Sequence, residues 1–63
     1  MVWENKDYRL EASRGADKRE YHIALKKRVG KLWELRLSFV QASASDIAEM
    51  VKWYKLKFVK QGA

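Results

Sequence analysis

The pattern that decides the fold lies in residues 21–40, which read YHIALKKRVGKLWELRLSFV. Apolar and polar side chains alternate through most of this stretch, and Gly30 interrupts the alternation at its middle. A period of two is typical of a strand with one buried face, and a glycine between two such runs is typical of a tight turn. The stretch therefore predicts a β-hairpin with strands at about 20–28 and 32–40.

The parity of the apolar positions predicts the length of this turn. If Leu25 and Leu35 share the buried face of an antiparallel pair, the loop between them contains an odd number of residues. Three residues around Gly30 are the simplest choice, and they fit better than a two-residue turn at Gly30-Lys31.

Another alternating run lies upstream of the hairpin. Leu10 and Ala12 alternate with polar residues and predict a strand at about 7–13. The apolar parity changes between this strand and the next, so the loop between them has an even number of residues. Gly15-Ala16 fits the Gly-X form of a type II′ turn.

After Gln41 the apolar period lengthens to that of a helix. Asp46 follows serine residues that are candidate N-caps, and Gly62 is a candidate C-cap. The spacing predicts a helix at about 46–61. Its apolar stripe consists of Ile47, Met50, Val51, Tyr54 and Phe58.

These elements predict an α+β fold: a three-stranded antiparallel meander with one C-terminal helix packed on its apolar face, in the order β-β-β-α. Residues 1–63 form a single small domain, and a core of this size is marginal by itself. Besides the helical stripe, the predicted core contains Tyr8, Leu10, Tyr21, Ile23, Leu25, Trp33, Leu35, Leu37 and Phe39.

Composition excludes several classes of function. The chain has no cysteine, so a disulfide scaffold and a thiolate metal site are impossible. No apolar run approaches the ~20 residues that a membrane span needs. We expect no cofactor and no metal, and a cytoplasmic location is the default. His22, with Ser38 and a glutamate nearby, suggests a hydrolase, but an open sheet face offers no oxyanion hole, so we expect no enzyme.

The net charge of +6 is concentrated in two blocks. Residues 18–31 contain six Lys or Arg against Glu20, and residues 52–63 contain four unopposed lysines. The basic residues of the predicted sheet face and hairpin tips suit contact with phosphates and bases, and duplex DNA is favoured over RNA. The predicted nucleic-acid-binding residues are Arg9, Lys18, Arg19, Lys26, Arg28, Lys31 and Arg36. The alternative is a solvated face in which interleaved glutamates pair with these bases.

Several apolar side chains find no place in the predicted core. Trp53, Leu56 and Val59 lie on the helix face turned away from the apolar stripe, and Trp3 precedes the first strand. Such a ridge predicts a second buried surface, in a homodimer or against another protein. The competing hypothesis is therefore a small protein-interaction module, a regulator or inhibitor that uses these four side chains as anchors.

The predicted order of three strands and a helix, with a basic outer sheet face, resembles the arm-type DNA-binding domains at the amino ends of phage integrases. The resemblance covers residues 8–60 in architecture alone, and it implies no residue roles. The leading hypothesis is a small non-enzymatic nucleic-acid-binding protein.

Overall fold

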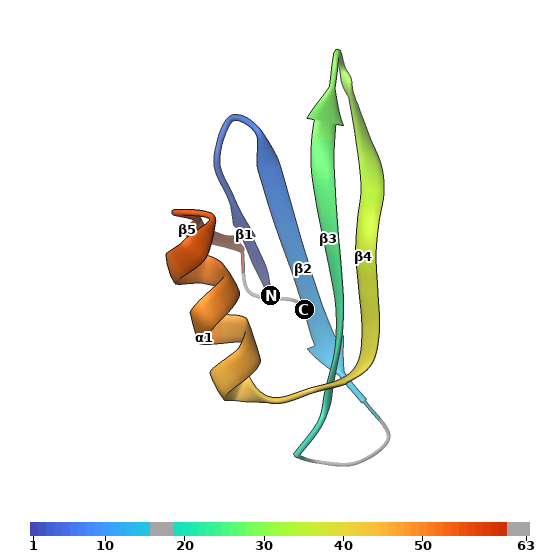
Figure 1. Cartoon of the computed structure of the whole chain (residues 1–63), viewed down its shortest axis with the longest axis vertical. Coiled ribbons are helices and arrows are strands. Elements are labelled where there is room, and N and C mark those ends of the chain that lie inside the picture. Colours follow the sequence, from blue (N-terminus) through green and yellow to red (C-terminus); the bar gives the residue numbers. More distant parts are fainter. Residues whose placement is uncertain (16–18, 61–63) are drawn as a thin grey trace.

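The computed structural model contains one five-stranded sheet and one helix, and it describes residues 1–15 and 19–60, with the backbone alone for Lys60. The elements in chain order are β1 (Val2–Glu4), β2 (Tyr8–Arg14), β3 (Tyr21–Val29), β4 (Leu32–Ala42), α1 (Ala44–Trp53) and β5 (Lys57–Lys60). The strand order is β4-β3-β2-β1-β5, and every neighbouring pair is antiparallel (Figure 1).

The predicted three-stranded sheet is therefore wrong, although the protein is still a small α+β fold. The three predicted strands exist, but β1 and β5 extend the sheet beyond β2. β1 pairs with both of its neighbours, and Trp3 packs edge-on against Phe58 of β5 with ring centroids 5.6 Å apart. The resemblance to the integrase arm-type domains rested on the β-β-β-α order, so it no longer supports a function.

The predicted helix over 46–61 is too long, because the chain leaves the helix at Tyr54. Lys55 adopts a left-handed conformation with φ 56°. The N–H of Leu56 then donates to the carbonyl of Val51, and the N–H of Lys55 donates to that of Lys52. These two bonds form a Schellman motif, which usually has glycine at the left-handed position. Gly62 lies outside the described residues.

The start of α1 matches the sequence more closely. Ser43 is the N-cap, and its hydroxyl accepts from the backbone N–H of Asp46 at 3.1 Å. The Asp46 carboxylate accepts in return from the backbone N–H of Ser43 at 2.9 Å, which completes a capping box. This bond lowers the pKa of Asp46 below its usual value.

The β3–β4 turn has two residues rather than the predicted three. Val29 pairs with Leu32, and Gly30 lies between them with φ 64°. The first position of a type II′ turn requires such a positive φ. The change of parity is made inside β4: Leu25 pairs with Leu37, but Lys26 pairs with Leu35. Arg36 is therefore the extra residue of a β-bulge.

The β2–β3 loop has the predicted even parity but not the predicted turn. Arg14 pairs with Tyr21, and the Gly15 N–H donates to the Glu20 carbonyl at 3.0 Å. This pairing leaves more than two residues in the loop, so Gly15-Ala16 is not a two-residue turn. Ala16 itself lies outside the described residues.

The core lies between α1 and the sheet, on the side that we call the helix side. The buried residues are Leu10, Ala12, Ile23, Leu25, Ala42, Ile47 and Leu56. On the other side of the sheet, the open face, none of the described residues forms a helix (Figure 1). Because cross-strand partners share a face, Trp33 lies there with Arg28, and Leu35 lies there with Lys26. Both were predicted to be in the core.

The helix covers only part of its side of the sheet. In β4 the single buried residue is Ala42, at the end of eleven residues. Six of the nine exposed large hydrophobic side chains belong to the β3–β4 hairpin. In the described part of the chain, no helix has the length and apolar character needed to cross a bilayer.

Candidate nucleic-acid interface

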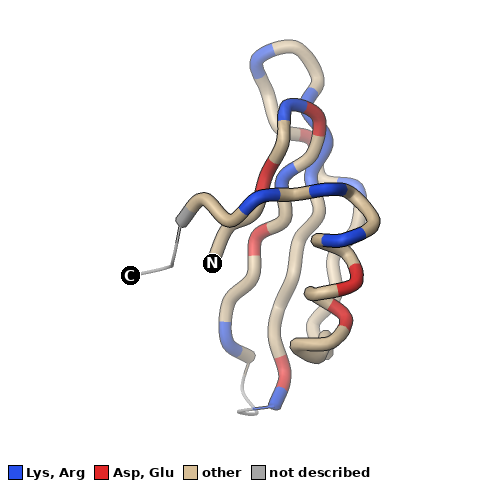
Figure 2. The backbone as a smooth tube through the Cα atoms, turned by 90° about the vertical axis from the view of Figure 1, so that its left-hand side faces the viewer, with Lys and Arg blue, Asp and Glu red and all other residues tan. Residues whose placement is uncertain are grey.

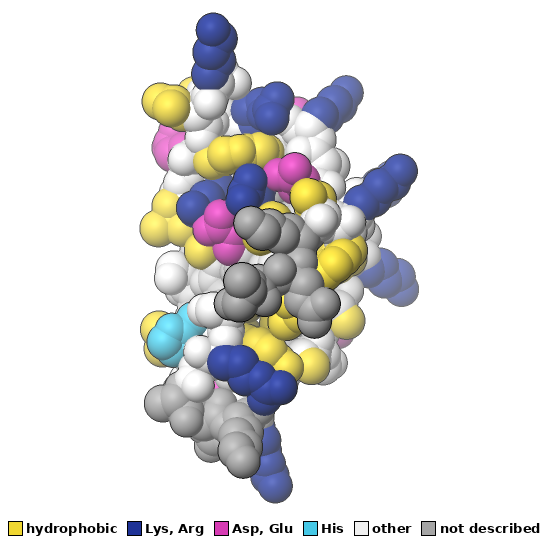
Figure 3. All heavy atoms as spheres, turned by 180° about the vertical axis from the view of Figure 1, so that it is seen from behind, with side chains coloured by type: hydrophobic (Ala, Val, Ile, Leu, Met, Phe, Trp, Pro, Cys, Tyr) yellow, Lys and Arg dark blue, Asp and Glu magenta, His cyan; other side chains and the backbone are white. Residues whose placement is uncertain are grey.

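Two of the predicted basic residues, Arg9 and Lys26, lie on the open face within a network of ion pairs. Lys26 Nζ is 2.8 Å from Glu11 Oε1, and Arg9 Nε is 3.0 Å from Glu11 Oε2. Arg9 also contacts Glu4 at 3.4 Å. Figure 3 shows this face, on which acidic side chains lie among the basic ones. Two cations and two carboxylates balance, so this part of the sheet offers little net charge to a polyanion.

The Glu11 carboxylate is the centre of this network. Its hydrogen bond to Lys26 lowers the pKa of Glu11 below the usual value, and the charges of Lys26 and Arg9 act in the same direction. Desolvation opposes them but does not cancel them. Glu11 therefore remains charged to a lower pH than an isolated glutamate.

The predicted residues of β3 and β4 are also engaged with neighbours. Arg36 Nη1 lies 3.4 Å from Glu34 Oε1, an exposed pair of small energetic weight. The Arg28 guanidinium lies over the Trp33 ring, 4.9 Å from its centroid. This cation–π contact orients Arg28 but leaves its charge uncompensated.

The remaining predicted residues lie at opposite ends of the sheet. Lys31 is exposed in the β3–β4 turn, whereas Arg19 lies just before β3, at the other end of that strand. Lys18 falls outside the described residues. The structure therefore brings Arg28 and Lys31 together, and it does not bring Arg19 to them.

The fold brings parts of the two basic blocks of the sequence, residues 27–31 and 52–57, toward one end of the molecule. The β1–β2 turn bridges them there: the Arg28 N–H donates to the Asp7 carbonyl at 2.7 Å, and Asn5 Nδ2 donates to the Tyr54 carbonyl at 2.7 Å. The rings of Tyr8 and Tyr54 are also in contact, with centroids 4.8 Å apart. The β1–β2 turn therefore lies between the β3–β4 hairpin and the C-terminal end of α1 and contacts both.

We call the resulting cluster the basic end. Figure 2 shows that most Lys and Arg positions crowd toward the end with the β1–β2 and β3–β4 turns, while the acidic positions of α1 lie farther away. The basic end consists of the exposed side chains of Lys6, Lys27, Arg28, Lys31, Lys52, Lys55 and Lys57.

These cations are largely unneutralised. Among the described residues, none of the seven has a carboxylate oxygen within 4.0 Å. Of the carboxylates nearby, Glu4 and Glu34 are paired with Arg9 and Arg36, and Asp7 lies in the β1–β2 turn. The Lys27 ammonium lies 6.0 Å from the centroid of Tyr8. A cluster of this kind raises the local concentration of polyanions.

Five members of the basic end were not among the predicted site residues: Lys6, Lys27, Lys52, Lys55 and Lys57. The signal that could have found three of them is the second basic block of the sequence, 52–63. On a continuous helix those lysines would be spread around the axis. The early helix end and the strand that follows place them near the β1–β2 turn instead, at the far edge of the sheet from β4.

The four predicted apolar anchors do not form one ridge. Leu56 is buried in the core, and Trp3 is half-buried against Phe58. Trp53 is 79% exposed on α1, and Val59 is exposed on β5. The ridge does not form because α1 ends at Trp53, so Leu56 and Val59 are not on the helix.

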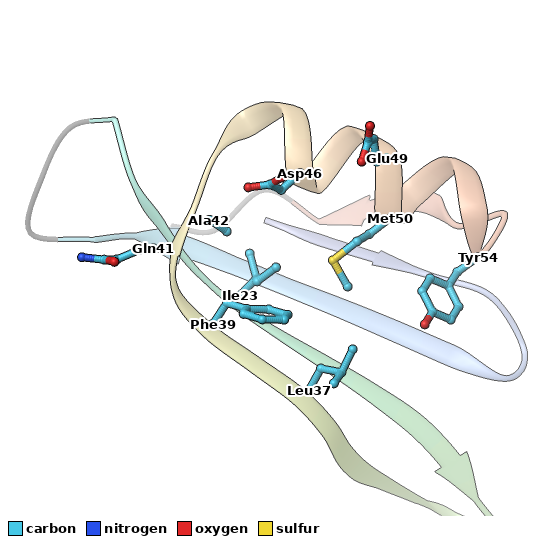
Figure 4. Close-up of a pocket in the computed structure, with 9 residues that line it drawn as sticks. All are labelled: Ile23, Leu37, Phe39, Gln41, Ala42, Asp46, Glu49, Met50 and Tyr54. Atoms are coloured by element: carbon cyan, nitrogen blue, oxygen red, sulfur yellow. The ribbon is translucent and has the colours of Figure 1, made fainter.

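A different apolar surface is exposed instead, on the helix side of the hairpin. Val29, Leu32, Leu37 and Phe39 are 43–75% exposed, and we call them the uncovered hairpin surface. Two of these residues, Leu37 and Phe39, form the floor of a groove of about 390 Å³ between β4 and α1 (Figure 4). Met50 and Glu49 line the helix wall of this groove.

His22 lies on the open face opposite Ser13, and Ser38 is opposite Ala24. His22, Ser13, Ser38 and Glu11 line a shallow hollow of about 370 Å³ that is open to solvent. Within the described ranges, no three His, Cys, Asp or Glu side chains come together as metal ligands would.

Comparisons of the chain with models of protein families, with curated proteins and with solved structures give no match.

Proposed function

We propose that this protein is a small nucleic-acid-binding protein that contacts duplex DNA through its basic end. The observation that carries the proposal is the convergence of seven exposed cations from three separate segments of the chain. Lysine side chains neutralise phosphates and release counterions, which supplies most of the affinity for nucleic acid. Arg28 and Lys31 were among the residues predicted from the sequence, whereas the balanced network of Arg9 and Lys26 plays a smaller part.

The shape of the basic end favours duplex DNA over RNA. The hairpin continues past the last β2–β3 pair, Tyr8 with Lys27, by two further residue pairs and the turn. A two-stranded ribbon of this kind fits the major groove of B-DNA. The major groove of A-form RNA is too deep and narrow for it, and single-stranded RNA would need several exposed aromatic rings for stacking.

The test is the salt dependence of binding to a labelled mixed-sequence duplex, measured by fluorescence anisotropy. We expect binding at about 50 mM salt that weakens steeply as salt rises. Lys31→Ala and Lys57→Ala are each expected to reduce the slope of log affinity against log salt by about one.

Arg19→Ala is the matched control, because it removes a positive charge from the opposite end of the molecule. It is expected to leave the slope close to that of the wild type. No binding at low salt, or equal effects of all three substitutions, would contradict binding through the basic end.

The second candidate function is that of a protein-interaction module, and the uncovered hairpin surface favours it. Exposed contiguous apolar side chains mark protein interfaces. The edge of β4 is poorly suited to strand addition, because the bulge at Arg36 and a further register shift near Ala42 interrupt it. The interaction would therefore use the side-chain face, and the simplest partner is a second copy, which would also enlarge the small core.

Sedimentation equilibrium tests this candidate. We expect the wild-type mass to rise above 7.5 kDa at high protein concentration and Leu32→Ser to return it to the monomer value. Val59→Ser removes an exposed apolar side chain from β5 and is the control. A wild type that stays monomeric at high concentration excludes a homodimer through this surface.

A further inference from the structure

We propose that Arg28 is a guanine-reading residue and that Trp33 holds it in position, so that the basic end selects sequence as well as charge. This inference rests on the proposed function, since it assigns a base contact to the same site. Its structural basis is the contact in which the Arg28 guanidinium lies over the Trp33 ring, 4.9 Å from the centroid.

The backbone around Arg28 is fixed from several sides. Arg28 and Trp33 are direct cross-strand partners on the open face of the hairpin. The Arg28 N–H donates to the Asp7 carbonyl at 2.7 Å, which ties this strand to the β1–β2 turn. The two-residue turn at Gly30 begins one residue pair farther on. Arg28 therefore projects from an anchored position near the tip.

The chemistry of arginine suits this position. A guanidinium held over the face of an indole, as Arg28 is at 4.9 Å, retains N–H groups that are free to donate hydrogen bonds. Guanine presents O6 and N7 side by side in the major groove, and a pair of guanidinium N–H groups matches them. Stacking also removes rotamer freedom before binding, which lowers the entropic cost of the contact.

The neighbours of Arg28 are suited to a different contact. Lys27, which directly precedes Arg28, and Lys31, in the turn, are both exposed. Their ammonium groups contact phosphates as point charges. Lys27 lies over the Tyr8 ring at 6.0 Å, but only Arg28 of the three combines an aromatic contact with a planar donor edge. Among the seven cations of the basic end, only Arg28 has an indole beneath it in the described structure.

Selection of binding sites from a randomised duplex library tests the inference. We expect the wild type to enrich a guanine at one position, with discrimination of about tenfold against other bases in direct binding. Arg28→Lys keeps the charge but loses the planar fork, so it is expected to bind with a similar salt slope and no guanine preference.

Trp33 is tested separately as a positioning residue. Trp33→Leu is expected to weaken the guanine preference without changing the salt slope, and Trp33→Phe is expected to restore part of the preference. If Trp33 has a purely structural role, Trp33→Leu lowers the melting temperature without changing base preference. Circular dichroism measures the melting temperature. Replacing the selected guanine by 7-deazaguanine, which lacks the N7 acceptor, is expected to reduce wild-type affinity.

The outcomes separate the two proposals. If the wild type binds duplexes without base preference, or if Arg28→Lys keeps the preference, the reading role of Arg28 is wrong and the basic end still stands. If the wild type binds no duplex at low salt, the proposed function fails, and the reading role fails with it.

Discussion

Lys55 shows how much one backbone conformation determines in this chain. It is the single non-glycine residue with positive φ in the described ranges, and it ends α1 so that β5 can join the sheet. A left-handed conformation costs an L-residue about 1–2 kcal/mol, whereas glycine adopts it freely. The closing bonds to Val51 and Lys52 and the burial of Leu56 hold Lys55 in this state.

Lys55→Gly is expected to stabilise the protein by about 1 kcal/mol, because glycine removes the strain of the left-handed position. Urea unfolding at neutral pH measures the change. Lys55→Ala is the control, since it removes the same charge but keeps the strain. Equal stability of the two variants would show that the conformation of Lys55 is not strained.

Glu11 gives a prediction for acid stability. Its folded pKa is lowered from the usual 4.5, so the ion pairs stabilise the folded state above that value and are lost as the pH falls through the folded pKa. Between about pH 6 and about pH 3, the wild type should therefore lose more stability than Glu11→Gln. Urea midpoints at the two pH values test this, and identical losses in both proteins would contradict it.

Asn5 links the β1–β2 turn to the C-terminal end of α1, where Tyr8 and Tyr54 also touch. Its side-chain oxygen accepts from the backbone N–H groups of Asp7 at 2.8 Å and Tyr8 at 2.7 Å, which shapes the β1–β2 turn. Its Nδ2 donates to the Tyr54 carbonyl, at the C-cap of α1. One amide therefore positions both the turn and the helix end beneath the basic end.

Asn5→Ala is expected to destabilise the protein by about 1–3 kcal/mol, since it leaves backbone groups at both places without partners. Asn5→Asp retains the acceptor for the turn but loses the donor to Tyr54, so an intermediate loss is expected. Thermal unfolding followed by circular dichroism measures both. A loss for Asn5→Asp as large as for Asn5→Ala would mean that the turn contributes nothing.

The elements with clear periodicity could be predicted from the sequence. The prediction was wrong where a single residue changes the direction of the chain. Strands β2, β3 and β4 and the start of α1 follow from alternation and capping residues. Phe58 continued the helical stripe by coincidence, so spacing alone could not reveal that the chain turns at Lys55. β1 has three residues, too few for a periodic pattern, and it is defined by pairing with β2 and β5.

The candidate site was less predictable than the fold, because it depends on which segments meet. The sequence separates Lys31 from Lys52 by a strand and most of a helix, and neither residue carries a local signal for the other. The pairing of Arg9 and Lys26 with Glu11 was likewise visible only as an alternative, since cross-strand geometry decides it. The bulge at Arg36 moved Leu35 to the open face for the same reason.

At the scale of the whole molecule, the net charge of +6 becomes an asymmetric distribution. One end carries seven exposed cations from the β1–β2 turn, the hairpin tip and the α1–β5 segment. On the open face, the charges of Arg9 and Lys26 are balanced by those of Glu4 and Glu11. The uncovered hairpin surface lies on the helix side of the same hairpin, as Lys27 does, whereas Arg28 lies on the open face. Substitution of its apolar side chains leaves the net charge unchanged, so the two surfaces can be tested separately.

An NMR titration of the 15N-labelled protein with a short duplex at low salt tests directly whether DNA binds through the basic end. We expect the largest shifts of backbone amides at Lys6, at residues 28–31 and at residues 52–57. Shifts centred on Arg9, Lys26 and Arg36 would instead place DNA on the open sheet face. Either that pattern or no shifts at all would contradict binding through the basic end.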